Sequence, residues 1–386
     1  MLKLKSIWTP HDIRTRLPKT GGLGFVFHAT DWETVHFAFQ GNAVQPHQLW
    51  NHGPFIGSPI FDQNQVIGCH IISPLPADLW ATSASGIRRF RKVGYHPSMK
   101  LAQEAGLTHI GLAALVPYAT RFGQLSSAHF NGHRTTGHAA TVAAIYLMLK
   151  KLENDFSVPI PRLTYAIFGG AGSIGSNVAR WLAHNGLRRQ ILVDLPNRLT
   201  QVQTLCEKLT MEYSDGHFVA HTAETLESGP AFDVGIVATN AGKPWLMERV
   251  LHQAPLWIDD SHPQAASQSV LTTTDVVYLE CCLLAPHGIS QTFPFRLPTP
   301  RHCYACFAEV YLCWKMQLKN DFVTGRASIN QIAMMDELLR KGGFSPSLAA
   351  SKQGTYIPIS RLERACQLLN TRIGRIRCTT VQRRKA

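Results

Sequence analysis

Residues 163–198 read LTYAIFGGAGSIGSNVARWLAHNGLRRQILVDLPNR: an apolar run, a glycine-rich turn, an amphipathic stretch and a second apolar run. Within the turn, Gly170, Gly172 and Gly175 have the spacing G-x-G-x-x-G. In this pattern the first glycine permits a tight turn, the second lets a pyrophosphate approach the backbone, and the third lets the helix pack closely on the sheet. The stretch therefore predicts a strand–turn–helix–strand unit that binds a dinucleotide.

The polar residues after this turn bear on which nicotinamide cofactor binds. Asp194 lies about 20 residues beyond the turn, at the end of an expected strand, where it would accept hydrogen bonds from a ribose 2′-hydroxyl and favour NAD. Arg198, together with Asn197, would instead hold a 2′-phosphate and favour NADP. The residues leave both alternatives open.

Two further parts of the cofactor have expected places. The phosphates would lie on N–H groups at the positive end of a helix over residues 174–185. The nicotinamide half would lie where the strand 233–238 ends, at the carboxyl edge of the sheet. The predicted cofactor-binding residues are Gly170, Ala171, Gly172, Ser173, Ile174, Gly175, Asp194, Asn197, Arg198, Thr239 and Asn240.

Apolar and amphipathic stretches alternate well beyond this unit. Strands are expected at 163–168, 190–194, 233–238 and 256–259, and helices at 174–185, 197–210, 303–320 and 328–341. The alternation predicts an α/β protein with a central Rossmann-type doubly wound parallel sheet in residues 159–292. An amino-terminal α/β domain would occupy residues 1–158, a helical carboxyl-terminal part residues 293–349, and a basic, partly mobile extension residues 350–386.

Length, composition and charge restrict the class of protein. A chain of 386 residues, 45% of them hydrophobic, is expected to form more than one globular domain. The formal net charge of +13 favours acidic partners, such as an acidic carrier protein or an anionic membrane surface. No recognised nucleic-acid motif accompanies the basic clusters at 88–92 and 372–385, so we expect no nucleic-acid partner.

The apolar stretches bear on cellular location. The amino terminus, MLKLKSIWTPHDIR, contains no apolar stretch of signal-peptide length. The longest apolar run, at 139–149, is shorter than the roughly 20 residues that span a bilayer. We therefore expect a cytoplasmic protein without a transmembrane segment, for which peripheral membrane contact stays open.

Nine cysteines form an odd and irregular set, which is more typical of reduced thiols than of a disulfide framework. Cys303 and Cys306 have CxxC spacing, which suits a zinc site, a redox dithiol or buried structural cysteines. A zinc site would need two further ligands, and although His302 and Cys313 are nearby, no second CxxC motif supplies them, so we expect no metal. The context is not that of thioredoxin, and residue types alone make a structural cysteine the default.

Several motifs follow one another in a recognisable order. They are GGAGSIGSNVARWL at 169–182, ACFAE at 305–309, Asp321-Phe322 with Gly325-Arg326, Ile329-Asn330 and GFSP at 343–346, with weaker matches at RTTG (134–137) and Asn197-Arg198. In these motifs the chain resembles the long-chain fatty acyl-[acyl-carrier-protein] reductases best known from cyanobacterial alkane synthesis. The resemblance covers roughly residues 20–350, and the ACFAE block with its downstream Gly-Arg is its specific part.

The resemblance implies an NADPH-dependent reduction of a fatty acyl thioester to a fatty aldehyde, with NADH as the alternative cofactor. It assigns the acyl-carrying nucleophile to Cys306, which would attack the thioester of acyl carrier protein or coenzyme A. A helix start and neighbouring cations would increase the thiolate fraction of this cysteine. Glu309, one turn away, and His138 are the other predicted catalytic residues, and His262 and His302 are further candidates for the general acid.

Three positions depart from the family pattern. His138 stands where the family usually has asparagine, Asp194 stands where an apolar residue is expected, and Cys303 replaces an apolar residue. Asp194 therefore leaves the preference for NADP open. The amino-terminal third, which helps to shape the acyl pocket in that family, is divergent here, so the acyl chain length and the choice of donor are open as well.

Two other functions are alternatives. One is a shikimate-dehydrogenase-like oxidoreductase of a small alcohol or ketone, in which Cys306 is inert. That class normally has a catalytic Lys and Asp in its amino-terminal domain, where this sequence has no convincing pair. The other is a non-enzymatic, nicotinamide-binding regulator that holds a partner through its basic tail.

Overall fold

The computed structural model describes residues 8–30, 32–39, 44–226, 229–241, 244–261, 264–281, 283–285, 288–291, 293, 297, 299, 302–348 and 356–383, with backbone alone at 37, 283 and 373–383. The chain divides into two compact units. The first consists of residues 1–140 with 284–345, and the second of residues 141–283 with 346–386.

The second unit is built on a parallel six-stranded sheet. Its strands, in spatial order, are β11 (Val277–Glu280), β10 (Leu256–Asp259), β9 (Val234–Val237), β6 (Tyr165–Phe168), β7 (Arg189–Asp194) and β8 (His217–Thr222). Every neighbouring pair is parallel. The strand order reverses at β6, which lies between β9 and β7, and this is the strand order and switch point of the doubly wound dinucleotide-binding fold. The predicted fold class is confirmed.

Helices surround this sheet. They are most of α7 (His138–Phe156), α8 (Ser173–His184), α9 (Leu199–Glu212), α10 (Ala223–Leu226), α11 (Glu248–Leu251), α12 (Gln268–Thr273) and α15 (Ile359–Arg383), with 3-10 turns at Ile160–Arg162 and Pro196–Arg198. In α8, Val178 and Leu182 are buried one turn apart, as the amphipathic pattern predicts. Gly186, with a φ of +83°, follows the helix and permits the chain to turn away.

The first unit contains a mixed six-stranded sheet. Its spatial order is β13 (Ile289–Gln291), β2 (Phe55–Asp62), β3 (Gln65–Ser73), β1 (Gly22–His28), β4 (Leu107–Leu112) and β5 (His133–Thr135). The pairs from β3 to β5 are parallel, whereas β2 runs antiparallel to β3, and β13 antiparallel to β2. Gln63 and Asn64 have φ values of 46° and 70°, the left-handed pair that a tight hairpin between β2 and β3 requires.

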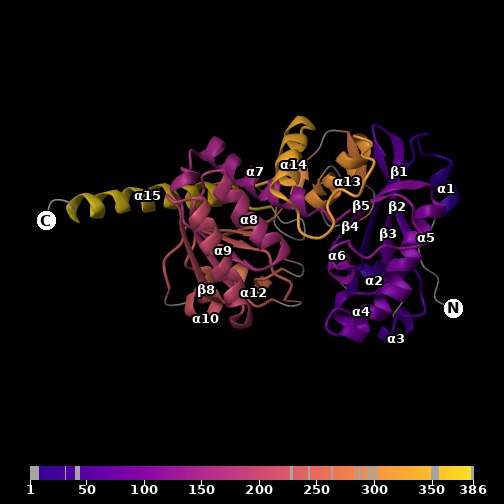
Figure 1. Cartoon of the computed structure of the whole chain (residues 1–386), viewed down its shortest axis with the longest axis horizontal. Coiled ribbons are helices and arrows are strands. Elements are labelled where there is room, and N and C mark those ends of the chain that lie inside the picture. Colours follow the sequence, from indigo (N-terminus) through magenta and orange to yellow (C-terminus); the bar gives the residue numbers. More distant parts are fainter. Residues whose placement is uncertain are drawn as a thin grey trace. The chain divides into compact units, whose positions relative to one another are not determined.

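The helices of the first unit come from both ends of its sequence. They are α1 (Pro10–Arg14), α2 (Trp32–Ala38), α3 (Pro46–Leu49), α4 (Ala84–Phe90), α5 (His96–Glu104), α6 (Val116–Ala119), α13 (Ala305–Lys315) and α14 (Ile329–Lys341), with a 3-10 turn at Ala77–Leu79 and a π-helical turn at Arg91–Tyr95. Figure 1 shows α13, in orange, beside the purple strands β4 and β5, although these segments are far apart in sequence. Residues 307–314 of α13 are all buried, because the helix packs on β1, β4 and α14.

Three sequence predictions differ from the observed organisation. The helical part expected at 293–349 is not separate, because α13 and α14 pack within the amino-terminal unit. The helix expected at 303–320 begins at Ala305, after the short strand β14 (Cys303–Tyr304), which shares a three-stranded sheet with β12 (Leu283–Ala285) and β15 (Ser345–Pro346). The extension expected at 350–386 is not a separate part, because residues 346–386 belong to the second unit and contain α15.

Two further properties concern membranes and thiols. No helix in the described part of the chain is both long enough and apolar enough to cross a bilayer. Six cysteines, at 69, 206, 303, 306, 313 and 366, are not in disulfides. Cys281 is disulfide-bonded, an exception among the expected reduced thiols of which the irregular spacing gave no sign.

Candidate active site

Cys306 is the second residue of α13 and its side chain is half-buried. No side chain caps the start of this helix, and the positive end of a helix favours a nearby anionic sulfur. Cys303 differs sharply, because it is fully buried and burial raises the pKa of its thiol well above the usual range. Of the two CxxC thiols, only Cys306 is accessible. Across the described ranges, no three His, Cys, Asp or Glu side chains are grouped as metal ligands would be.

The loop between β5 and α7 lies directly against Cys306. At its centre is Gly137, whose φ of +77° is one that residues with a side chain rarely adopt. A Cβ atom added at Gly137 would lie 2.1 Å from the Cβ of Cys306. The backbone of residue 137 therefore forms one wall of the cysteine's surroundings, and only glycine fits there.

Glu309 holds this loop in place. Its carboxylate is fully buried and accepts hydrogen bonds from the Gly137 N–H at 3.0 Å, from the Ala140 N–H at 2.7 Å and from the Thr135 hydroxyl. Burial raises the pKa of Glu309 to about 7, and the hydrogen bonds from Thr135 and the loop act in the opposite direction. Glu309 is therefore not a solvated charge on the first helical turns. It is a positioning residue that joins α13 to the loop at Cys306.

His138 begins α7 and directly follows Gly137, so it lies at the end of the loop that contacts Cys306. Its side chain is 7% exposed, and burial lowers its pKa to about 4. The imidazole is therefore neutral at neutral pH. His302, the second general-acid candidate, has its Nδ1 atom 2.8 Å from the Thr299 hydroxyl, and burial lowers its pKa. His262 lies outside the described residues.

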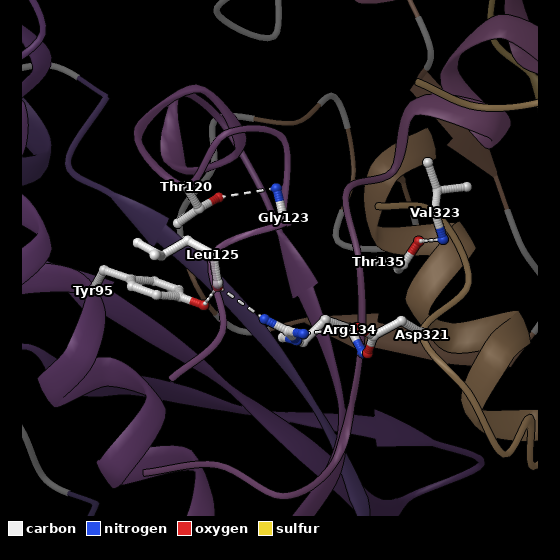
Figure 2. A network of polar contacts seen from close by, with 8 residues as sticks. All are labelled: Tyr95, Thr120, Gly123, Leu125, Arg134, Thr135, Asp321 and Val323. Atoms are coloured by element: carbon white, nitrogen blue, oxygen red, sulfur yellow. Dashed lines mark hydrogen bonds and ion pairs between the residues drawn. The ribbon is translucent and has the colours of Figure 1, made fainter. Parts of the chain in front are cut away.

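A second set of polar contacts fastens the other side of the loop (Figure 2). Arg134 donates a backbone and a side-chain hydrogen bond to the Asp321 carboxylate, each at 2.7 Å, and a further bond to the Leu125 carbonyl at 2.9 Å. The Thr136 N–H donates to the Val323 carbonyl at 3.2 Å. The RTTG, ACFAE and Asp321-Phe322 motifs thus form one constellation. Sequence reasoning missed Thr135, Gly137 and Asp321 as parts of the site; the signal that could have found them was their place in the matching motifs.

We expect Gly137→Ala to disturb Cys306 directly. The new methyl group would overlap the cysteine and strain a left-handed backbone, so the free energy of unfolding should fall by roughly 2 kcal/mol or more. The matched control is Gly186→Ala. Gly186 has a φ of +83°, but an added Cβ would meet nothing within 4 Å. Denaturant unfolding and the rate of Cys306 alkylation by iodoacetamide measure the effect, and an equal change in both variants would contradict it.

In the glycine turn of the second unit, backbone segments approach one another as closely as the motif predicts, but the role predicted for Gly170 belongs to another glycine. Gly169, and not Gly170, is the left-handed residue of the turn, with a φ of +85°. A Cβ atom added at Gly169 would lie only 2.3 Å from the Ala238 carbonyl oxygen, so there is no room for a side chain. A Cβ at Gly175 would lie 2.2 Å from the Gly169 oxygen, so this glycine does permit the close packing of α8. Gly172 precedes α8 and no side chain caps the helix, an arrangement that suits a bound phosphate.

Asp194 lies half-buried at the carboxyl end of β7 and faces this turn. Its Oδ2 atom accepts a hydrogen bond from the Ala171 N–H at 2.8 Å, and its Oδ1 atom accepts one from the Leu195 N–H at 2.8 Å. Both bonds fix the carboxylate beside the turn, where a ribose hydroxyl would be an additional donor. Asn197 and Arg198 are exposed in the 3-10 turn that follows.

The ends of β9 and β10 supply the last predicted contacts in this unit. The Thr239 hydroxyl accepts one hydrogen bond from the Trp245 indole N–H at 3.0 Å, and the Thr239 N–H donates to the Ser261 hydroxyl at 3.1 Å. Asn240 is exposed beside it. The uncapped helix, the glycine-rich turn and the carboxylate at the end of β7 are together a donor and acceptor set that fits a dinucleotide.

Comparisons with known proteins do not assign a family. No family model matches the chain, and no curated protein matches its sequence. Similar solved structures include L-tryptophan dehydrogenase from Nostoc punctiforme (12% identity, 93% of this chain, 90% of that chain, TM-score 0.37). A second is the malic enzyme from Pyrococcus horikoshii (12% identity, 95% of this chain, 79% of that chain, TM-score 0.38). A third is quinate dehydrogenase from Corynebacterium glutamicum in complex with NAD (12% identity, 89% of this chain, 97% of that chain, TM-score 0.33). At these TM-scores the function has to be argued from the site itself.

Proposed function

We propose that this protein is a nicotinamide-dependent oxidoreductase that reduces a long-chain fatty acyl thioester to a fatty aldehyde. The observation that carries the proposal is the placement of Cys306. An accessible thiol at the start of a helix is suited to covalent catalysis. The loop at Gly137 lies against this cysteine, and the buried carboxylate of Glu309 anchors the loop. The strand order and glycine turn of the second unit support the use of a nicotinamide.

In the proposed reaction, the Cys306 thiolate attacks the thioester carbonyl and forms a new sulfur–carbon bond, while the bond to the donor sulfur breaks and the donor leaves as a thiolate that takes up a proton. When bound at the helix start after Gly172, NADPH or NADH would supply the hydride, and the acyl-enzyme on Cys306 would become a thiohemiacetal anion. Collapse of this species breaks the sulfur–carbon bond, releases the aldehyde and regenerates the Cys306 thiolate. The covalent route replaces one difficult step with two easier ones.

The residues of the chain divide this work. Glu309 and Gly137 fix the sulfur, and His138, predicted to assist proton transfer, is neutral at neutral pH, so it would donate from an imidazole N–H. The helix start after Gly172 would hold the cofactor phosphates. The resemblance points to NADPH, whereas the carboxylate of Asp194 suits the ribose of NADH.

The proposed acyl donor is acyl carrier protein or coenzyme A in the cytoplasm. Both donors are acidic, and the chain carries a net charge of +13, which favours their encounter. The same charge suits peripheral contact with an anionic membrane. We propose no nucleic-acid partner.

The direct test is to incubate the unaltered protein with palmitoyl-coenzyme A or palmitoyl-acyl carrier protein, without cofactor, and to record its intact mass. We expect a hydroxylamine-labile palmitoyl adduct that peptide mapping places on Cys306. Addition of NADPH or NADH should discharge it as hexadecanal, and titration with each will decide between the two. Absence of an adduct overturns the proposal. Turnover of a small hydroxy acid would then support the shikimate-dehydrogenase-like alternative, and nicotinamide binding without turnover the regulator.

A further inference from the structure

The segment before the Cys306 loop contains an unusual turn. Arg121, Phe122 and Gly123 follow one another with φ values of 53°, 57° and 78°. The left-handed conformation costs a residue with a side chain about 1–2 kcal/mol, and bulky residues rarely adopt it. Such strain persists only where the surroundings enforce it, and it is concentrated at functional sites.

Hydrogen bonds hold this turn on both sides of Phe122. The Phe122 N–H donates to the Pro117 carbonyl at 2.6 Å, and the Phe122 carbonyl accepts from the Gly325 N–H at 2.5 Å. The Gly123 N–H donates to the Thr120 hydroxyl at 3.1 Å (Figure 2). The backbone of residue 122 is therefore fixed, and with it the direction in which the side chain leaves the chain.

The fixed direction places an aromatic ring beside the candidate active site. The ring of Phe122 is 5.9 Å from the ring of His138, between centroids, at an interplanar angle of 62°. His138 follows Gly137, whose backbone contacts Cys306. Phe122 is nevertheless 38% exposed. A strained backbone thus holds a partly exposed phenyl ring beside His138, and both the backbone strain and the exposed apolar surface cost stability.

We propose that Phe122 is a specificity-determining residue that contacts the apolar chain of the substrate. This inference rests on the proposed function and adds the residue by which the site would select long acyl chains over short ones. A long alkyl chain would bury the exposed face of the ring and gain free energy with each methylene in contact. A short acyl group held on Cys306 would gain little, because it would not extend to the ring.

The test compares Phe122→Gly with the matched control Arg121→Gly. Both substitutions relieve a left-handed residue, but only the first removes the ring, and Arg121 is an exposed residue outside the proposed machinery. The measurement is the second-order rate constant of acylation by palmitoyl- and butyryl-coenzyme A, followed by intact mass. We expect Phe122→Gly to lower the palmitoyl rate constant about ten-fold and the butyryl rate constant less than about two-fold. Arg121→Gly should change neither.

A third variant, Phe122→Leu, guards against a loss that reflects misfolding, because it keeps an apolar side chain and should retain most of the palmitoyl rate. The melting temperatures of both glycine variants should stay equal to the parent's or rise. Unchanged palmitoyl preference in Phe122→Gly, or equal loss with both substrates together with a lower melting temperature, overturns the inference alone. If the parent protein accepts neither acyl group, the proposed function falls and the inference falls with it.

Discussion

Cys306→Ala is expected to abolish the acyl adduct and to lower aldehyde formation by roughly a hundred-fold or more, because every other free thiol among the described side chains is buried. Its nearest rival, Cys303, is fully buried, and burial raises its thiol pKa far enough that little thiolate forms at neutral pH. Intact mass after incubation with palmitoyl-coenzyme A measures adduct formation, and NADPH consumption measures turnover.

Cys303→Ala is the matched control for this experiment. Cys303 lies three residues before Cys306, and its sulfur is buried in the interior. Removal of this sulfur should cost about 1 kcal/mol of stability and leave the adduct on Cys306. The reverse pattern, with an adduct that survives Cys306→Ala and disappears in Cys303→Ala, would move the nucleophile to the buried position. An adduct that survives both substitutions would remove the CxxC pair from the mechanism.

Glu309→Ala is expected to lower the free energy of unfolding by roughly 3 kcal/mol or more and to reduce activity together with it. The substitution leaves the Thr135 hydroxyl and the N–H groups of Gly137 and Ala140 without their acceptor in a fully buried place. Because Gly137 contacts Cys306, loss of the anchor should also slow acylation of the sulfur. Denaturant unfolding and acylation by palmitoyl-coenzyme A measure the two effects.

The pH dependence of stability gives Glu309 a separate signature. Its pKa rises from 4.5 to about 7 in the folded protein because the carboxyl group is buried. Between these values the unfolded chain releases a proton that the folded protein retains, so the stability contribution is complete below pH 4.5 and is lost as the pH rises to about 7. The loss should amount to roughly 3 kcal/mol and level off above that pH.

Glu309→Gln should remove this slope, because the amide does not titrate. One oxygen acceptor is retained, so this variant should be less destabilised at neutral pH than Glu309→Ala. Unfolding in denaturant near pH 5 and pH 8, for parent and variant, makes the comparison. A slope that is equally steep in Glu309→Gln would show that other groups cause it and that the Glu309 pKa is close to its usual value.

Local features of the sequence were sufficient for the glycine turn of the second unit and for four of the six strands in its sheet. The glycine turn, the stripe of Val178 and Leu182 in α8 and the acidic residue at the end of β7 all depend on neighbours within a few tens of residues. Strands β8 and β11 were missed: β8 is rich in polar residues, and β11 has only four residues and is buried throughout, so neither has a clear alternation. Parallel strands covered on both faces carry little periodicity of their own.

Within motifs, the three-dimensional structure corrected individual roles. The spacing of the glycines identified the turn, but the left-handed residue proved to be Gly169, one position before the motif. The CxxC spacing does not distinguish the accessibility of its two cysteines, whereas in the structure Cys303 is buried in β14 and Cys306 is accessible in α13. Spacing along the chain defines which residues are close, and burial depends on what packs against them from elsewhere.

By its local patterns alone, the sequence determined a dinucleotide-type unit, whereas the resemblance of its motifs to a known family pointed to the cysteine, glutamate and histidine of a second site. Only the fold decided that Thr135 and Glu309, 174 positions apart, share a buried hydrogen bond, and that α13 belongs to the amino-terminal unit. The physical reason is that a turn or a helix start depends on adjacent residues. The burial of a carboxylate and its hydrogen-bond partners depend instead on distant segments that meet only when the chain packs.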